Sequence, residues 1–139
     1  MQDNGANTVP YSYTLKVAEK DIDELLHVNN VVYLQWVNDI SERHWNKLSS
    51  KSLSEKYFWV VLRHELDYLG QAVLHDELTL VTWVGHSRGA KSLRYVEIYK
   101  EETLCLKATS TWCLIDAQTL KPTRIKDDIL DTLKPGQKS

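Results

Sequence analysis

The sequence has no long hydrophobic run and no block of charge of one sign. No apolar stretch in its 139 residues approaches the roughly 18 residues that a membrane-spanning helix needs. The opening MQDNGANTVP lacks the apolar segment of a signal peptide. Lysine and arginine number 17 against 19 acidic residues, a net charge of −2 without any basic cluster. We therefore expect a cytoplasmic protein that binds neither nucleic acid nor membranes.

Cysteine is scarce as well, with Cys105 and Cys113 the only two in the sequence. Both lie in one segment that is typical of a single β-strand. Eight residues of strand span about 26 Å, far more than the ~7 Å allowed between the Cα atoms of a disulfide. We therefore predict two free thiols, which suit a reducing compartment, and interpret both residues as packing residues.

Common cofactor and metal motifs are also missing. There is no phosphate-binding loop and no dinucleotide fingerprint. The histidines, at positions 27, 44, 64, 75 and 86, show no HxxxH or HExxH spacing. We expect neither a metal ion nor a cofactor.

The composition is that of a folded globular protein. Hydrophobic residues make up 42% of the chain and charged residues 26%, without repeats or a linker. A chain of 139 residues can bury a real core, so residues 1–139 are predicted to form a single domain.

The hydrophobic pattern predicts one long helix and about five strands. From Asn30 to about Leu48 the apolar residues recur at helical spacing without Gly or Pro, and Asn29 or Asn30 is a natural N-cap. Strands are predicted at residues 11–19, 58–69, 77–86, 92–100 and 104–116, with a short final helix at 126–134. This order indicates an α+β domain with an antiparallel sheet.

Residues 85–89 read GHSRG, which fits the GxSxG pattern of the nucleophile elbow in many esterases. An elbow leads into a helix, whereas the residues that follow here alternate as a strand. The partner histidine should also lie downstream, yet His86 is the last histidine of the chain. We interpret the segment as a hairpin in which Gly85 and Gly89 supply permissive backbone, and reject Ser87 as a nucleophile.

Residues 21–33, DIDELLHVNNVVY, form the candidate site. They place carboxylates, a histidine and two asparagines just before a helix start, where unpaired N–H groups and the positive end of the helix dipole favour an oxyanion. A carboxylate facing that helix start would complete a minimal acyl-transfer site. The alternative is that Asp21 and Asp23 are ordinary turn residues, and that Asn29 and Asn30 only cap the helix.

The motif DxDxxxHVNNxxY, with Trp36 three positions further on, resembles the hotdog-fold thioesterases. The likeness is to the 4-hydroxybenzoyl-CoA and acyl-CoA thioesterase branch and to the acyl-carrier-protein thioesterases. It continues through residues 63–84 and 108–125, so it covers most of the chain. It implies an α+β hotdog fold, in which a curved antiparallel sheet wraps a long central helix, and a homodimer or homotetramer with sites at the subunit interface.

The resemblance also implies roles for individual residues. Asp23 corresponds to the catalytic aspartate, acting as general base on water or as nucleophile. The backbone N–H near Asn30 corresponds to the donor that polarises the thioester carbonyl. His27 and Asn29 correspond to positions that shape the pocket, and the histidine has a catalytic part in the carrier-protein branch. Tyr33 is expected in the core or in the acyl-pocket wall.

The substrate implied is an acyl-CoA or an acyl-carrier-protein thioester, with coenzyme A present only as part of the substrate. Basic residues should meet the CoA phosphates at the pocket rim, and Arg88 and Lys91 in the predicted hairpin, with Arg94 beyond it, are candidates. The alternative is that these charges belong to an ordinary solvated turn.

The sequence departs from the family pattern near the motif. Leu26 stands where members often carry Gly before the histidine, and Leu25 stands where the plant carrier-protein enzymes have Asn, which argues against that assignment. Within residues 68–76, Gln71 and His75 replace a Pro and a Gly, so the shape of these loops is in question.

We therefore predict an acyl-CoA thioesterase, with an acyl-carrier-protein thioesterase as the alternative. A hotdog acyl-CoA binding protein without turnover is a second alternative, but a purely binding site would not need Asp23. A hotdog hydratase or dehydratase would use a different arrangement of histidine and acid on the central helix.

Overall fold

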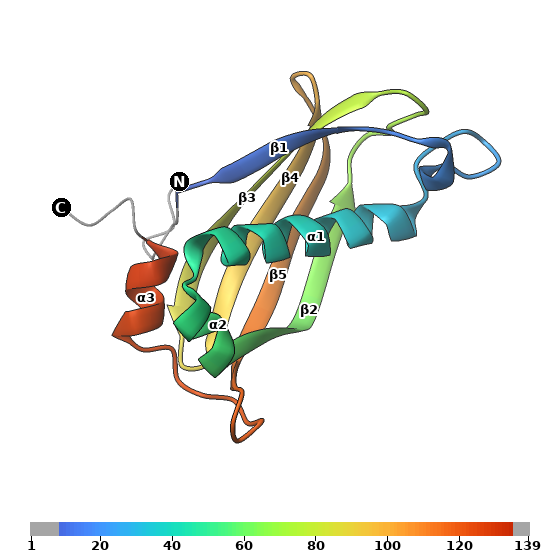
Figure 1. The fold of residues 1–139 in the computed structure, drawn as a ribbon. Helices are drawn as coiled ribbons and strands as arrows, with labels where there is room; N and C mark the ends of the chain where they lie inside the picture. The colour runs from blue at the N-terminus through green and yellow to red at the C-terminus, as the bar shows by residue number, and fades with distance from the viewer. Residues whose placement is uncertain (1–8, 135–139) are drawn as a thin grey trace.

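The computed structural model describes residues 9–134, in which one antiparallel sheet curves around one long helix (Figure 1). The strands are β1 (Tyr11–Lys16), β2 (Tyr57–Tyr68), β3 (Glu77–Arg88), β4 (Lys91–Lys100) and β5 (Thr103–Asp116). The helices are α1 (Asn30–Leu48), α2 (Lys51–Lys56) and α3 (Asp127–Leu133), and a 3-10 turn, η1 (Glu19–Asp21), follows β1. The predicted α+β hotdog architecture is confirmed.

The five strands formed by residues 9–134 lie in the order β1-β3-β4-β5-β2, and every neighbouring pair is antiparallel. Tight hairpins join β3 to β4 and β4 to β5, as predicted. The two strands nearest the N-terminus therefore occupy the two edges, and α1 joins them across one face of the sheet (Figure 1).

Helix α1 has the boundaries that the pattern predicts. Its start is fixed by Asn29, whose side chain accepts a hydrogen bond from the Val31 N–H at 3.0 Å. Val37 and Ile40 lie at the centre of the buried stripe and are fully buried. Burying an aliphatic side chain of this size stabilises the fold by about 1.5–3 kcal/mol, so packing against the sheet holds the helix in place.

Two apolar clusters make up the core. The larger one lies where α1 packs on the middle of the sheet, and it includes Val37, Ile40, Leu80 and Val96. The second lies at the far end of the sheet, where α3 packs with Trp45 from the end of α1. The short final helix was predicted, and it closes that end of the domain.

A further helix, α2, lies between the predicted long helix and the second predicted strand, and it was not among the predicted elements. Ser50 begins this helix by accepting a hydrogen bond from the Leu53 N–H at 3.1 Å. Six residues are too few to show a helical period, so this cap was the only local signal.

The segment GHSRG is a hairpin, as predicted, and Gly89 adopts a left-handed φ of 63° in its turn. Gly85 does not belong to the turn. It lies inside β3, where the pairing with β4 shifts register between Val84 and Ser87. The Ser87 hydroxyl donates to the hydroxyl of Ser92 at 2.9 Å, and no helix follows it, so the rejection of an elbow stands.

Both cysteines lie in β5, buried and unbridged, which confirms the prediction of free thiols. No helix within residues 9–134 is long and apolar enough to cross a membrane. Residues 1–8, which hold most of the segment where no signal peptide is expected, lie outside the described residues.

A polar cluster interrupts the core between α1 and the sheet. The Nη1 atom of Arg94 donates to the Nδ1 atom of His44 and to the hydroxyl of Thr82, both at 3.0 Å. Burial, together with the adjacent guanidinium, lowers the pKa of His44 to about 4. The imidazole is therefore neutral at physiological pH and accepts from Arg94, while its ring stacks on Tyr11.

We expect the stability of the fold to depend on this neutral histidine. In the unfolded chain His44 binds a proton with its ordinary pKa of 6.5, whereas in the folded chain its pKa is about 4. The free energy of unfolding therefore falls as the pH decreases from 6.5 to about 4. The expected loss from His44 is on the order of 2 kcal/mol. Urea denaturation at pH 7 and pH 4 measures it, with His44→Gln as the reference.

His64, whose pKa burial also lowers, contributes in the same direction in both proteins, so the difference between them isolates His44. An equal loss of stability in the wild type and in His44→Gln would contradict the prediction.

Candidate active site

The loop that precedes α1 holds Asp23 through its own backbone. The Asp23 N–H donates to the His27 carbonyl at 2.8 Å, and the Leu26 N–H donates to the Asp23 carbonyl at 3.0 Å. The Oδ1 atom of Asp23 accepts from the N–H groups of Leu25 (2.9 Å) and His27 (3.2 Å). The loop backbone thus orients the carboxylate, and no other side chain of residues 9–134 hydrogen-bonds to it.

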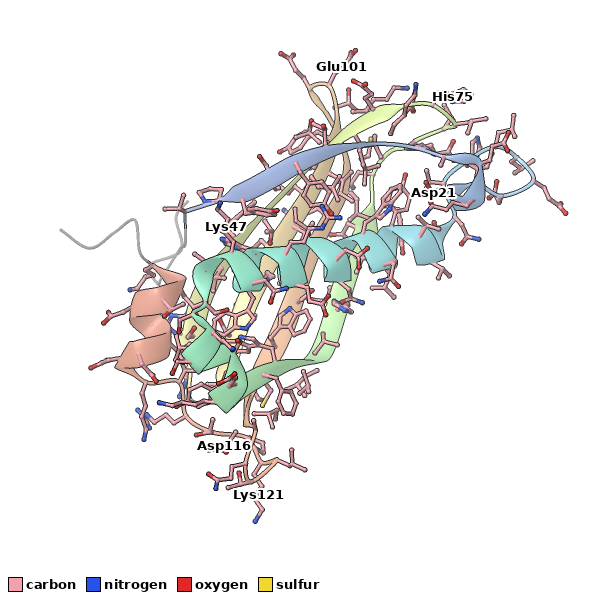
Figure 2. All side chains as sticks on the ribbon, viewed as in Figure 1. Asp21, Lys47, His75, Glu101, Asp116 and Lys121 are labelled. Carbon is pink, nitrogen blue, oxygen red and sulfur yellow. The ribbon has the colours of Figure 1, made fainter. Side chains whose placement is uncertain are left out.

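This loop is also tied to the rest of the fold. The Val28 N–H donates to the Ala72 carbonyl and the Asn29 N–H donates to the Asp21 carbonyl, both at 3.0 Å. The buried carboxylate of Asp21 accepts from the Ala18 N–H at 2.9 Å, so Asp21 orders the loop. Figure 2 shows Asp21 and His75 at the same end of the molecule, next to the start of α1.

The first turn of α1 leaves one backbone donor over. The side chain of Asn29 accepts a hydrogen bond from the Val31 N–H. The backbone carbonyl of Asn29 accepts from the N–H groups of Val32 (2.9 Å) and Tyr33 (3.3 Å). Within residues 9–134 the Asn30 N–H has no protein acceptor. It lies at the positive end of the helix dipole, where an anionic or polarised oxygen is stabilised.

Asp23 and Asn30 line the same cavity, whose volume is about 380 Å³. The other residues around it are His27, Val28, Tyr33, Tyr68, Leu69, Gly70, Gln71 and Ala72. The Tyr33 hydroxyl accepts from the Ala72 N–H at 3.1 Å, and burial raises the pKa of Tyr33, so the phenol is neutral. The cavity therefore offers one carboxylate and one free backbone donor against an aromatic wall.

The sequence matches the acyl-ACP thioesterase N-terminal domain family over residues 7–133. The chain belongs to this family. The protein is therefore a thioester hydrolase, and the fold predicted from the HVNN motif is the fold of its relatives. No curated protein matches the sequence.

Solved structures share the fold of this thioesterase. A probable thioesterase from Escherichia coli, YbaW, is 25% identical with a TM-score of 0.76, over 88% of this chain and 96% of that one. A Staphylococcus aureus protein in complex with CoA is 17% identical with a TM-score of 0.79, over 90% and 82%. An acyl-ACP thioesterase from Bacteroides thetaiotaomicron is 17% identical with a TM-score of 0.79, over 90% and 53%.

The residues proposed from sequence fall into two groups. Asp23, His27, Asn30 and Tyr33 come together around the cavity of the thioesterase. The side chain of Asn29 caps α1. Asn29 therefore fixes the start of the helix and does not line the cavity.

Arg88 and Lys91 lie elsewhere in the thioesterase. They pair with each other across the β3–β4 hairpin, and Lys91 also pairs with Cys113 near the end of β5. Figure 2 shows Asp116, the last residue of β5, at the opposite end of the molecule from Asp21. Within one chain neither residue therefore lies at the rim of the Asp23 cavity.

One wall of the cavity was not predicted. Tyr68, Leu69, Gly70 and Gln71 line it from the end of β2 and the loop that follows. The likeness of residues 68–76 to thioesterase sequences was a signal, but it says nothing of which element this segment faces. That placement depends on β2 ending beside the start of α1.

Four described non-glycine residues of the thioesterase have a positive φ, and two of them, Leu26 and His75, lie in the loops next to the cavity. Leu26 has a φ of 66° and His75 a φ of 75°, and both are positions where the resemblance to the thioesterases implies a Gly. The loops thus keep the backbone that glycine adopts freely, although a side chain with a Cβ is strained there. Glu101 and Leu120 have the same conformation in other turns, so the strain is not confined to the segments around the cavity.

We expect Leu26→Gly and His75→Gly to stabilise the protein by about 1 kcal/mol each, because glycine removes the left-handed penalty. Thermal or urea denaturation measures the gain. Leu25→Gly is the matched control, because Leu25 is next to Leu26 and has an ordinary φ. This variant should be less stable than the wild type or equally stable. Destabilisation by all three substitutions alike would contradict a strained loop.

Proposed function

We propose that this thioesterase hydrolyses acyl-CoA, with Asp23 as general base or nucleophile and the Asn30 N–H as the donor to the thioester carbonyl. The observation that carries the proposal is that this carboxylate and this free donor line one cavity. A base or nucleophile on one side of a carbonyl and a hydrogen-bond donor on the other are the minimum that acyl transfer needs.

The chemistry follows from the two groups. The carbonyl oxygen accepts a hydrogen bond from the Asn30 N–H, and the helix dipole stabilises the negative charge that develops on it. Asp23 either takes a proton from a water that attacks the carbonyl carbon, after which the C–S bond breaks and the thiolate leaves, or attacks that carbon itself and expels the thiolate to form an anhydride that water then hydrolyses. Because a thiolate is a good leaving group, little acid catalysis is required on either route.

The hydrogen bonds of Asp23 support this role. Both backbone donors, from Leu25 and His27, are on Oδ1. Among the described residues Oδ2 has no donor, so one carboxylate oxygen is held while the other is available for reaction. His27 lines the same cavity and also fixes Asp23 through its backbone, so we assign it to shaping the site.

Acyl-carrier protein is the second candidate for the thiol carrier. The family match and the Bacteroides thetaiotaomicron acyl-ACP thioesterase favour it. The complex of the Staphylococcus aureus protein with CoA favours coenzyme A, as does Leu25 in place of the asparagine of the plant carrier-protein enzymes. The two carriers share the thioester, so the roles of Asp23 and Asn30 are the same for both.

We expect Asp23→Asn to lower kcat by about 100-fold or more while KM stays within a few-fold, because the amide fits the site but neither takes a proton nor attacks. Free-thiol release from short, long and aromatic acyl-CoAs, and from acyl-carrier-protein thioesters, measures this. Asp127→Asn, on the exposed first turn of α3, is the matched control and should be unaffected.

Near-normal turnover by Asp23→Asn would remove Asp23 from the mechanism. Wild-type activity confined to carrier-protein thioesters would select the second carrier.

We also propose that the thioesterase forms a homodimer or homotetramer. Strand β2 is an edge of the sheet, and its exposed side chains include Leu62 (53%) and Tyr68 (46%), followed by Leu69 (57%). Val31, at the start of α1, is 71% exposed. A long apolar edge of this kind pairs with another strand unless something covers it.

Light scattering should therefore give a mass of at least twice the 16.1 kDa of one chain. Leu62→Lys, which puts a charge on the apolar edge, should shift the protein towards the monomer. A wild-type mass of one chain would contradict the oligomer.

A further inference from the structure

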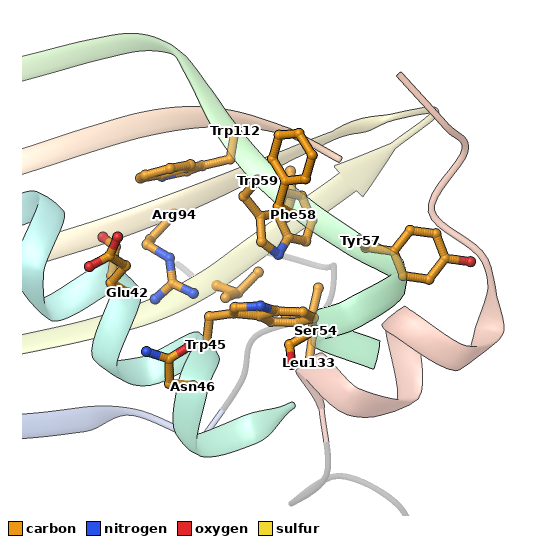
Figure 3. A pocket seen from close by; sticks show the side chains of 13 residues that line it. Glu42, Trp45, Asn46, Ser54, Tyr57, Phe58, Trp59, Arg94, Trp112 and Leu133 are labelled. Atoms are coloured by element: carbon orange, nitrogen blue, oxygen red, sulfur yellow. The ribbon is translucent and has the colours of Figure 1, made fainter. Parts of the chain in front are cut away.

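A second cavity, of about 420 Å³, lies towards the other end of α1 and shares no lining residue with the Asp23 cavity (Figure 3). It lies between the last turns of α1, helix α2 and the neighbouring parts of β2 to β5. Aromatic side chains dominate its wall: Trp45, Tyr57, Phe58, Trp59 and Trp112. Its volume is within the usual range for small-molecule sites.

Arg94 brings an unneutralised charge to this cavity. It is only 7% exposed, and its two side-chain hydrogen bonds, to His44 and Thr82, both come from Nη1. Both partners are uncharged, and no carboxylate of residues 9–134 lies within ion-pair distance. Burial lowers the pKa of Arg94 to about 9, which reflects the cost of holding this charge out of water.

A second donor on the same wall is also unused. The indole Nε1 of Trp112 is buried, and among the described residues it has no hydrogen-bond partner. Buried polar groups are nearly always hydrogen-bonded, so an unpaired one on a side chain that lines a cavity favours a ligand acceptor there. In Figure 3 the guanidinium of Arg94 lies below the indole of Trp112 and to the left of the indole of Trp45.

We propose that this cavity binds a small aromatic carboxylate, which accepts hydrogen bonds from Arg94 and Trp112 and places its ring among the tryptophans. A planar anion with two oxygens matches the guanidinium better than a spherical one. The indole faces supply the stacking surfaces that an aromatic ring needs. One arginine and one N–H suit a single negative charge and leave a doubly charged phosphate undercompensated.

Glu42 limits how much negative charge a ligand in this cavity can carry. It is exposed and lines the same cavity, so its carboxylate repels an anion and competes for Arg94. The site therefore admits a monoanion at some cost, and removing the charge of Glu42 should strengthen binding. Because the Asp23 cavity is separate, binding here is measured without hydrolysis and does not depend on the proposed substrate.

The experiment is a ¹⁹F NMR titration of the full-length protein with 4-fluorobenzoate and with its uncharged counterpart, 4-fluorobenzamide. We expect saturable binding of the carboxylate, with the amide at least about 10-fold weaker, because it lacks the charge that Arg94 pairs with. Quenching of tryptophan fluorescence gives an independent readout from the cavity wall.

Variants assign the binding to this cavity. Arg94→Met should weaken binding of the carboxylate by about 10-fold or more. Arg124→Met, which makes the same change of charge at an exposed site, should leave that binding unchanged. Trp112→Phe keeps a ring but removes the donor and should weaken binding several-fold, and Glu42→Gln should tighten it. If Arg94→Met fails to fold, these last two carry the test.

Equal binding of carboxylate and amide would overturn the proposal. So would full binding by Arg94→Met or by Trp112→Phe, or no binding to the wild type at millimolar carboxylate.

Discussion

The burial of one face of α1 in the curve of the sheet is the constraint on which the rest of the molecule depends. Val37 and Ile40 are completely buried, and the sheet wraps them from both edges. With the middle of the helix fixed in this way, its first turn is fixed as well. The chain before Asn30 and the chain after β2 then have to close around that turn, and together they form the Asp23 cavity.

Backbone hydrogen bonds hold the two reacting groups of the cavity in place. N–H groups of its own loop hold the Asp23 carboxylate. Asn29 accepts hydrogen bonds from every backbone N–H of the first helical turn except that of Asn30. Left-handed residues on both sides, Leu26 and His75, show that the fold tolerates strain to keep these loops in place. Groups that are preorganised in this way stabilise a developing charge without having to rearrange during the reaction.

Much of this was predictable because the signals are local. The absence of Gly and Pro from residues 30–48, with Asn29 before them, defines α1, and alternation with short turns defines β2 to β5. The pairing of Asp23 with the helix start follows from their nearness in the chain. The wall that Tyr68 and Gln71 provide depends instead on a contact between distant segments, which no local pattern contains.

The Arg94 cavity was missed for a different reason. Arg94 occupies an inward position of β4, in line with Ser92, Val96 and Ile98, where alternation alone predicts an apolar residue. From sequence alone, a charged residue is predicted to be exposed, because charged side chains are seldom fully buried. Only the structure shows that it is buried without a carboxylate partner.

The central claim concerns where the thioester carbonyl binds, and a crystal structure of Asp23→Asn with a ketone analogue of acyl-CoA, in which a methylene replaces the sulfur, tests it directly. We predict that the carbonyl oxygen lies within hydrogen-bond distance of the Asn30 N–H, with the side chain at position 23 facing the carbonyl carbon. A carbonyl bound away from the start of α1 would contradict this account.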